Sequence, residues 1–423
     1  MGSTASKPAA RGNGDGARQT PTARATGYGA CLLYLIVDFG RPMDWIPALE
    51  YLRLGMVAAF WGFAASISSR KRPIPKPMWY MIAFLLAMAW GVPWAKNNAW
   101  AFWGFEEHAI FILGCVLPLA VLPGNVDSVR KLMTFYFFLH VPMAIHGLMY
   151  EGTGAGGWIA DENDLALGLN AALGVGMYLA MEAQSAGRRF LILASMAVMV
   201  TGVVSTISRG GFVGLATMGA YLVVFSPKRG VALAAVAGFA IVLVLFAGPT
   251  FWHEVDSIKT ADQVGDTGEE RLYYWGLGWK MFLDNPVIGV GTRNFPIQVY
   301  MYEDKRRAQN GDHAWGRAAH SFPITLLAEH GLVGTSLVLL MLGWVVKAHR
   351  RLLRAWKEAP TDPRRRSSAL LGSGIVAGLV GFMVSSIFLS SLYYPIVWVL
   401  VALFASLDAV SGTERESELA AAS

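Results

Sequence analysis

The stretch FLILASMAVMVTGVVSTISRGGFVGLATMGAYLVVF, residues 190–225, consists of two apolar runs joined by one short polar turn. A helix needs about 20 apolar residues to cross a hydrocarbon core of roughly 30 Å, and each run comes close to that length. The turn, Ser-Arg-Gly-Gly at 208–211, contains two glycines, which permit a tight reversal of the chain. The stretch therefore predicts two antiparallel membrane-spanning helices.

The rest of the chain repeats this pattern. Of its 423 residues, 54% are hydrophobic and only 15% are charged, whereas a soluble domain carries about 25% charged residues. We expect an all-α polytopic membrane protein with about twelve spans. The expected spans are 27–40, 49–68, 78–94, 105–122, 132–149, 164–182, 190–207, 211–226, 231–248, 321–346, 369–388 and 392–409.

The basic residues of the short links set the expected orientation. If the spans alternate in direction, six basic groups fall on one side; they lie within residues 7–24, 70–76, 130–131, 188–189, 228–229 and 347–366. Loops rich in lysine and arginine are retained on the cytoplasmic side of a membrane, so both termini are expected there. Topology thus accounts for the net charge of +6, and we expect no nucleic-acid partner.

One outer link is far longer than the others. Residues 249–320 exceed the roughly 12–15 residues of an ordinary loop and are rich in aromatic side chains, among them Phe251 and Trp252. Within this link, EERLYYWGLGWKMFL at 269–283 predicts an amphipathic helix on the membrane interface. The expected organisation is a disordered cytoplasmic tail, nine spans, a large helical loop on the outer side, three spans and a second cytoplasmic tail. Their bounds are 1–26, 27–248, 249–320, 321–409 and 410–423.

Three arginines, Arg209, Arg271 and Arg293, lie on the outer side, where retention of positive charge does not explain them. An anionic ligand is the simplest explanation. Structural alternatives remain open for each: Arg209 could snorkel from a helix end, and Arg271 could form a surface ion pair with a neighbouring glutamate. The Gly-rich turn around Arg293 could offer backbone amides to an anion. A fourth outer arginine, Arg41, has Asp44 as a local partner, which favours a structural role.

His320 precedes the tenth expected span, with Ser321 as a candidate N-cap and Pro323 in the first turn. The positive end of a helix favours a neutral imidazole, which can accept a proton from a hydroxyl group. The alternative is a hydrogen-bonded interfacial histidine. Further along, Glu329 is an ionisable residue within an apolar segment, and such residues are functional candidates. It could instead stay hydrated if the first turns of 321–346 protrude from the membrane.

Residues 161–164, Asp-Glu-Asn-Asp, suit the N-terminus of the span that follows them, because acidic residues cap helices there. The chain has no metal-ligand spacing, Walker-type loop or nucleophile elbow, and its two cysteines, Cys31 and Cys115, lie in apolar runs. We expect no metal and no cofactor. The energy for any reaction would then come from an activated substrate.

The ordered motifs resemble those of the O-antigen ligase and polymerase family of membrane glycan transferases. They are DENDLA at 161–166, SRGG at 208–211, ERLYYW at 270–275, DNPVIGVGTRNF at 284–295, AHS at 319–321 and EHGLVG at 329–334. The resemblance extends over about residues 150–346, and the remainder agrees in being apolar. Ser321 stands where the family usually has asparagine, and this difference bears on the identity of the substrate.

The resemblance implies inverting, metal-independent transfer of a glycan from undecaprenyl diphosphate to an acceptor hydroxyl at the periplasmic face. It places the chain in the bacterial cytoplasmic (inner) membrane, and the long outer loop 249–320 would then be periplasmic. It implies that Arg209 and Arg271 bind the diphosphate and that His320 is the catalytic base. Possible substrate-binding residues are Arg293, Asn163, Glu329 and Ser321. The partners would be the lipid-linked donor, a glycan, lipid A-core or protein acceptor, and membrane lipids.

Two alternatives remain. A polysaccharide polymerase of the same family differs from a ligase only in its acceptor, and the sequence does not separate them. A transporter or flippase for an anionic lipid or solute would place charges at mid-membrane in paired broken helices. The outer arginines lie at one face instead, which favours glycan transfer.

Overall fold

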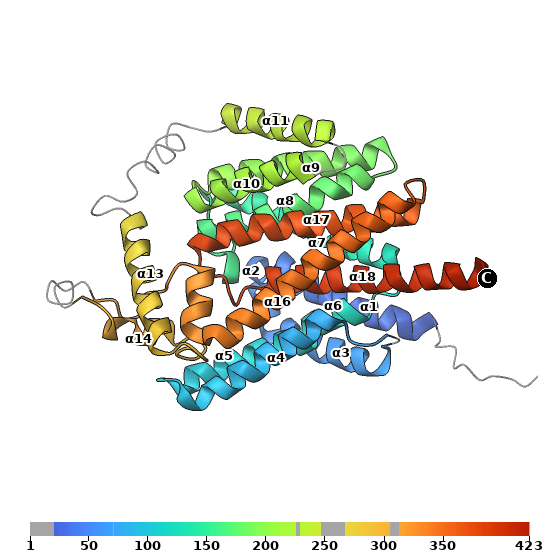
Figure 1. Ribbon diagram of the computed structural model, residues 1–423. Coiled ribbons are helices and arrows are strands. Elements are labelled where there is room, and N and C mark those ends of the chain that lie inside the picture. The colour runs from blue at the N-terminus through green and yellow to red at the C-terminus, as the bar shows by residue number, and fades with distance from the viewer. Residues whose placement is uncertain (1–20, 71, 226–228, 247–266, 305–312, 423) are drawn as a thin grey trace, which may run out of the picture.

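The computed structural model describes residues 21–70, 72–225, 229–246, 267–304 and 313–422, and within these ranges the chain is helical without strands (Figure 1). The α-helices are α1 (Pro21–Leu35), α2 (Pro42–Trp45), α3 (Leu54–Ser68), α4 (Lys76–Gly91), α5 (Asn98–Phe111), α6 (Leu117–Val121), α7 (Val126–Met149), α8 (Glu162–Glu182), α9 (Ala186–Ser205), α10 (Arg209–Phe225), α11 (Arg229–Phe246), α13 (Thr267–Asp284), α14 (Phe295–Gln298), α16 (Phe322–Glu358), α17 (Pro363–Ser385) and α18 (Pro395–Ala422). Short 3-10 or π segments are η1 (Ile36–Gly40), η2 (Pro47–Leu52), η3 (Val92–Trp94), η4 (Ile112–Val116), η5 (Gly157–Ile159), η7 (Val299–Met301) and η8 (Ser386–Phe388).

The expected all-α polytopic membrane fold is confirmed. Among the described residues, nine helical stretches are long and apolar enough to cross a membrane, and two shorter apolar helices cover Gly27–Gly40 and Arg209–Phe225. Helix α11 overlaps the remaining expected span, 231–248, as far as Phe246. Each of the expected spans therefore corresponds to a helix, which is consistent with a count of about twelve.

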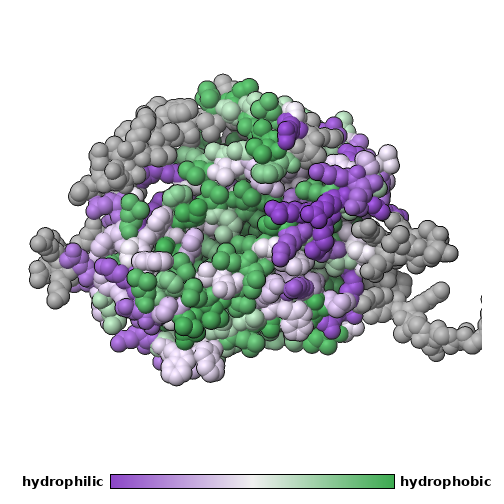
Figure 2. All heavy atoms as spheres, in the orientation of Figure 1, coloured by the Kyte–Doolittle hydropathy of each residue, from purple (hydrophilic) through white to green (hydrophobic). Residues whose placement is uncertain are grey.

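Polar and apolar surfaces separate along the direction of the long helices. Figure 2 shows apolar residues across the middle of the molecule and hydrophilic residues gathered towards its two ends. At one end α1 begins and α18 ends (Figure 1), and the basic link between α16 and α17 lies there too. This is the separation that a lipid bilayer imposes on a helical bundle. That the basic end faces the cytoplasm remains a prediction.

Helix α8 is the centre of the bundle, since its most apolar 18-residue window is entirely buried. It packs against α17, α9, α10 and α7. A Cβ atom on Gly174 would lie 2.3 Å from the backbone nitrogen of Gly378, so the α8 and α17 backbones meet at a contact that only glycine permits. Small residues at helix contacts are typical of packing in membranes, where close backbone approach replaces hydrophobic burial.

Helix α16 is broken at Gly331, where φ is 57° and ψ is −155°, although the sequence predicts one continuous span over 321–346. Helix α16 bends in Figure 1, and the segment 286–291 packs into the break. Four backbone hydrogen bonds join the two: Leu332 N to Pro286 O (2.8 Å), Val333 N to Val287 O (3.0 Å), Val290 N to Ala328 O (2.8 Å) and Gly291 N to Glu329 O (3.0 Å). The loop thus satisfies the backbone groups that the break exposes.

Helices α13 and α14 form an outer layer, in which α13 crosses the ends of the long helices (Figure 1). It buries Tyr274, Leu277 and Met281 at helical spacing, and it exposes Trp279 and Leu272. The structure confirms that this segment is a helix with one buried and one exposed face, as expected of an amphipathic helix. Its position on a membrane interface stays a prediction.

The expected boundaries differ from the structure at both ends. Helix α1 begins at Pro21, so the last residues of the expected tail 1–26 are helical, and residues 1–20 lie outside the described residues. Helix α18 continues to Ala422, so the helix of the last span extends through residues 410–422 of the expected C-terminal tail. In the expected loop 249–320, Phe251 and Trp252 lie outside the described residues.

Candidate functional site

A cavity of about 380 Å³ lies where the first turn of α8, the first turns of α13 and the segment before α16 meet. It therefore opens at the end of the bundle that carries the outer layer. Its lining residues are Asp161, Asn163, Asp164, Glu270, Arg271, Tyr274, Arg317, Ala318, His320, Leu389, Ser390 and Tyr394. Three residues predicted from sequence, Asn163, Arg271 and His320, thus share one cavity although they are far apart in the chain.

His320 adopts a left-handed backbone conformation with φ of 46°, which is uncommon for a residue with a side chain and occurs more often at functional sites. Its imidazole remains exposed to the cavity. Partial burial lowers the pKa of His320 below its ordinary value, and the positive charges of Arg271 and Arg317 lower that pKa further. The imidazole is therefore neutral near pH 7 and has a lone pair that can accept a proton.

Ser321 is the N-cap residue of α16, as the sequence predicts, but its hydroxyl makes no capping hydrogen bond. The expected capping role is wrong in this respect. The buried Ser321 instead accepts hydrogen bonds at its carbonyl oxygen, from the amide (2.9 Å) and the hydroxyl (2.7 Å) of Thr325. Pro323 lies in the first turn, as expected. The bonded carbonyl fixes the start of the helix next to His320.

Asn163 joins the first turns of α8 and α10. Its backbone amide (2.8 Å) and its side-chain amide (2.9 Å) both donate to Oδ1 of Asp161, which caps α8 as expected. Its side-chain oxygen accepts a hydrogen bond from the hydroxyl of Ser208 (2.7 Å), and that hydroxyl in turn accepts one from the amide of Gly211 (3.0 Å). These bonds hold the Ser-Arg-Gly-Gly turn against the cavity wall.

The two arginines that are expected to bind a diphosphate differ in their position relative to the cavity. Arg271 lies in the first turns of α13 and lines the cavity. Arg209 is the half-buried first residue of α10 and is not among the lining residues. It follows Ser208, so it lies next to the turn that Asn163 holds. The structure thus groups Arg271 with His320 and puts Arg209 at the adjoining turn.

Arg293 and Glu329 belong to a second cluster, outside the cavity lining. The side chain of Glu329 is only 2% exposed, so of the two alternatives left open the structure has the buried one. Its two oxygens accept hydrogen bonds from the backbone amides of Arg293 and Phe295, each at 2.9 Å. The guanidinium of Arg293 pairs with Glu107 at 2.5 Å. Glu329 therefore fastens the 286–295 segment to α16.

Two adjacent tyrosines connect this cluster with the cavity. The hydroxyl of Tyr393 donates to Glu329 and lies 2.8 Å from Nε2 of His330. The hydroxyl of Tyr394 donates to Asp164 at 3.0 Å inside the cavity. Both tyrosines stand directly before α18, so the link between α17 and α18 joins the two regions.

Several lining residues are absent from the sequence-based set. Arg317 is three residues before His320, and its position on the outer side could have indicated it. Tyr394 lies in a short polar and aromatic link at the start of the last span, which is a weak signal by itself.

Two further expectations concern Arg41 and metal binding. Arg41, for which a local partner was expected, does pair with Asp44, at 2.9 Å from Nη2 to Oδ1. No group of three or more His, Cys, Asp or Glu residues in the described ranges is placed to hold a metal ion.

Replacing Glu329 with alanine is expected to destabilise the folded protein by roughly 3 kcal/mol, because buried donors left without an acceptor cost about 1–3 kcal/mol each. The donors affected are the amides of Arg293 and Phe295 and the hydroxyl of Tyr393. The measurement is the thermal unfolding midpoint of the detergent-purified protein. Glu107→Ala is the matched control: its carboxylate is 63% exposed, and a surface ion pair contributes about 0–1 kcal/mol. Equal midpoints for the two variants would contradict the anchoring role of Glu329.

The fold and the cavity define a class: a multi-span helical membrane protein with arginine and a neutral histidine in a polar cavity at one face. Residues 194–339 match the family model described as O-antigen ligase, which confirms the family resemblance over that part of the chain. The match contains Arg209, Arg271, Arg293, His320 and Glu329, whereas Asn163 lies before it. It supports glycosyl transfer of the O-antigen ligase or polymerase kind, in a bacterial membrane. No curated protein matches the chain.

Proposed function

We propose that the protein transfers a glycan from undecaprenyl diphosphate to an acceptor hydroxyl at the outer face of the cytoplasmic membrane, with inversion and without a metal ion. The observation that carries the proposal is the shared cavity of Arg271 and His320. A cation for a leaving group and a base for a nucleophile are the two requirements of such a displacement. A ligase acceptor is favoured over a polymerase acceptor only by the description of the matched family.

The charges of the cavity suit a substrate that is part phosphate and part sugar. Arg271 and Arg317 offer guanidinium forks, which bind phosphate through paired N–H donors. Arg209 lies at the adjoining turn and would add a third cation. The carboxylates of Asp161 and Glu270 are acceptors for sugar hydroxyls, and Tyr274 offers an aromatic face. The mixed lining therefore favours a glycosyl diphosphate over a simple inorganic anion.

In the proposed step, the acceptor oxygen forms a bond to the anomeric carbon while the bond from that carbon to the diphosphate oxygen breaks. His320 takes the proton from the acceptor hydroxyl, and the bonding electrons leave with the diphosphate. Arg271 stabilises the charge that grows on the leaving group, which is a stronger interaction in the transition state than in the bound substrate. Attack from the side opposite the leaving group inverts the anomeric centre.

The test is an assay in vesicles that contain the purified protein, a lipid-linked glycan and candidate acceptors. Transfer of one glycan to lipid A-core or protein would establish ligation, and a ladder of lengthening products would establish polymerisation. Movement of the lipid-linked glycan across the vesicle membrane, with no new glycosidic bond, would overturn the proposal in favour of transport.

The rate of transfer is expected to fall at low pH with a midpoint below 6.5, the ordinary pKa of histidine. The rate falls on the acid side because protonation removes the base. The midpoint lies below 6.5 because the lowered pKa of His320 lets the active neutral form persist to lower pH. Arg317→Gln removes one of the charges that lower this pKa, so its acid limb should move upward, towards 6.5. The measurement is kcat against pH for both proteins. An acid limb that does not move in Arg317→Gln would contradict the assignment of this limb to His320.

A further inference from the structure

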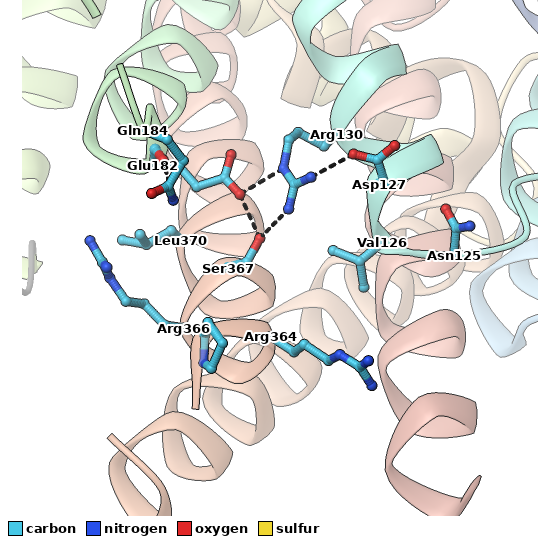
Figure 3. Close-up of a pocket in the computed structure, with 11 residues that line it drawn as sticks. Asn125, Val126, Asp127, Arg130, Glu182, Gln184, Arg364, Arg366, Ser367 and Leu370 are labelled. Atoms are coloured by element: carbon cyan, nitrogen blue, oxygen red, sulfur yellow. Dashed lines mark hydrogen bonds and ion pairs between the residues drawn. The ribbon is translucent and has the colours of Figure 1, made fainter. Parts of the chain in front are cut away.

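A second cavity, of about 580 Å³, lies at the other end of α8 (Figure 3). It is formed by the first turns of α7 and α17, by Glu182 at the end of α8, and by Gln184 two residues beyond that end. Helix α8 has 21 residues, which extend about 30 Å at 1.5 Å per residue, the thickness of a hydrocarbon core. Since Asn163 at the start of α8 lines the candidate active site, the two cavities lie at opposite faces of the membrane.

One wall of this second cavity is a closed network of ion pairs and hydrogen bonds. Arg130 donates to Glu182 (2.6 Å), Asp127 (2.6 Å) and Ser367 (2.9 Å), and the hydroxyl of Ser367 donates to Glu182 (2.6 Å). Lys131 pairs with the second oxygen of Asp127 at 2.9 Å. Both carboxylates of the wall are thus held by cations of α7, and the network ties α7, α8 and α17 together.

The opposite wall carries positive charge from α17. Figure 3 shows Arg364 and Arg366 extending from the first turn of this helix, on the other side of the cavity from Arg130. The lining therefore contains three arginines against two carboxylates, and Arg130 already pairs with both carboxylates. Among the described residues, no carboxylate pairs with the guanidinium of Arg366. The lining thus has one more cation than carboxylates, and Arg366 carries positive charge on the α17 side of the cavity.

The chemistry of this space selects a phosphate group. A guanidinium fork matches phosphate oxygens through paired N–H donors. Val126 and Leu370 provide buried apolar surface next to these charges, as a lipid glycerol and the start of an acyl chain require. Basic pockets between membrane helices are suited to anionic lipid head groups.

We propose that this cavity binds the phosphodiester of an anionic membrane lipid in the leaflet opposite the candidate active site, held by Arg364 and Arg366. The bound head group bridges the start of α17 to α7 and α8. Helix α17 continues to the segment that holds Leu389 and Ser390 in the active-site lining, so the lipid stabilises the helices that carry the outer cavity. The site is independent of the proposed glycan transfer.

The test uses the full chain in a neutral detergent, with intrinsic tryptophan fluorescence reporting the unfolding midpoint. Phosphatidylglycerol is expected to raise the midpoint by about 2–5 °C when it is well above its dissociation constant, because a ligand of the folded state stabilises it by mass action. The variant R364Q/R366Q should lose this rise. The matched control R350Q/R354Q removes the same charge from exposed positions near the end of α16 that do not line the cavity, and it should keep the rise.

Three comparisons decide the outcome. An equal rise in R364Q/R366Q and in the natural sequence, or no rise in either, would overturn the site. An equal rise with phosphatidylcholine would overturn recognition of anionic charge. An equal rise with inorganic phosphate alone would support the phosphate site but assign it to a soluble anion. If the double variant does not fold, R366Q alone should lose at least half of the rise, and a full rise in R366Q would overturn the proposal.

Discussion

Replacing His320 with alanine is expected to lower kcat for glycan transfer by about 10²–10⁴-fold, the usual contribution of a positioned general base. The reason is geometric and electrostatic together. The imidazole faces the cavity, and burial and the nearby arginines lower its pKa, so that it is neutral near pH 7. Without it, the attacking hydroxyl loses the neutral imidazole that receives its proton. The measurement is initial rate in vesicles with saturating lipid-linked glycan and acceptor.

His313→Ala is the control for this variant. His313 lies in the same outer segment and is exposed, but it faces Glu303 at 3.5 Å and does not line the cavity. Its substitution should leave kcat within about 2-fold, because surface changes away from a site have small effects. His320→Gln keeps hydrogen-bonding capacity but not basicity and should be as slow as His320→Ala. Full activity in His320→Gln would show that the side chain only positions the substrate.

The helical spans could be predicted because apolar length is a local property of the chain. A membrane requires each crossing segment to satisfy its own backbone and to be apolar for about 20 residues. Both conditions can be read one segment at a time, and residues 162–182 or 186–205 meet them without reference to any distant residue. The grouping of Arg271 with His320 was predictable for a related reason, since both lie on the outer side of the expected topology.

The break in α16 could not be predicted in the same way. Residues 322–346 form an apolar run that reads as one helix, and only the docking of residues 286–291 makes the interruption at Gly331 stable. The role of Glu329 depends on the same contact, because its two carboxylate oxygens accept hydrogen bonds from backbone amides 34 and 36 positions earlier in the chain. Tyr394 reaches Asp164 across 230 positions. Such long-range partners leave no periodic signal in a single sequence.

Replacing Arg271 with alanine is expected to lower kcat by about 10²–10³-fold, since loss of one donor to developing negative charge has effects of this size. Arg271 lines the cavity together with His320, so a diphosphate bound beside the base lies within reach of its guanidinium. Arg271→Lys keeps the charge but loses the fork, and should recover only part of the rate. The measurement is kcat and KM for the lipid-linked donor in the vesicle assay.

Lys280→Ala is the matched control, because Lys280 is an exposed cation of the same helix, nine residues beyond Arg271. At 100° per residue that spacing puts it on the opposite face of α13, away from the cavity. If general attraction of an anionic lipid were the function of α13, both substitutions would raise KM by similar factors and leave kcat nearly unchanged. A selective loss of kcat in Arg271→Ala instead means that the guanidinium acts on the transition state, since uniform binding affects KM alone. The ratio of the two kcat values therefore separates leaving-group stabilisation from electrostatic attraction.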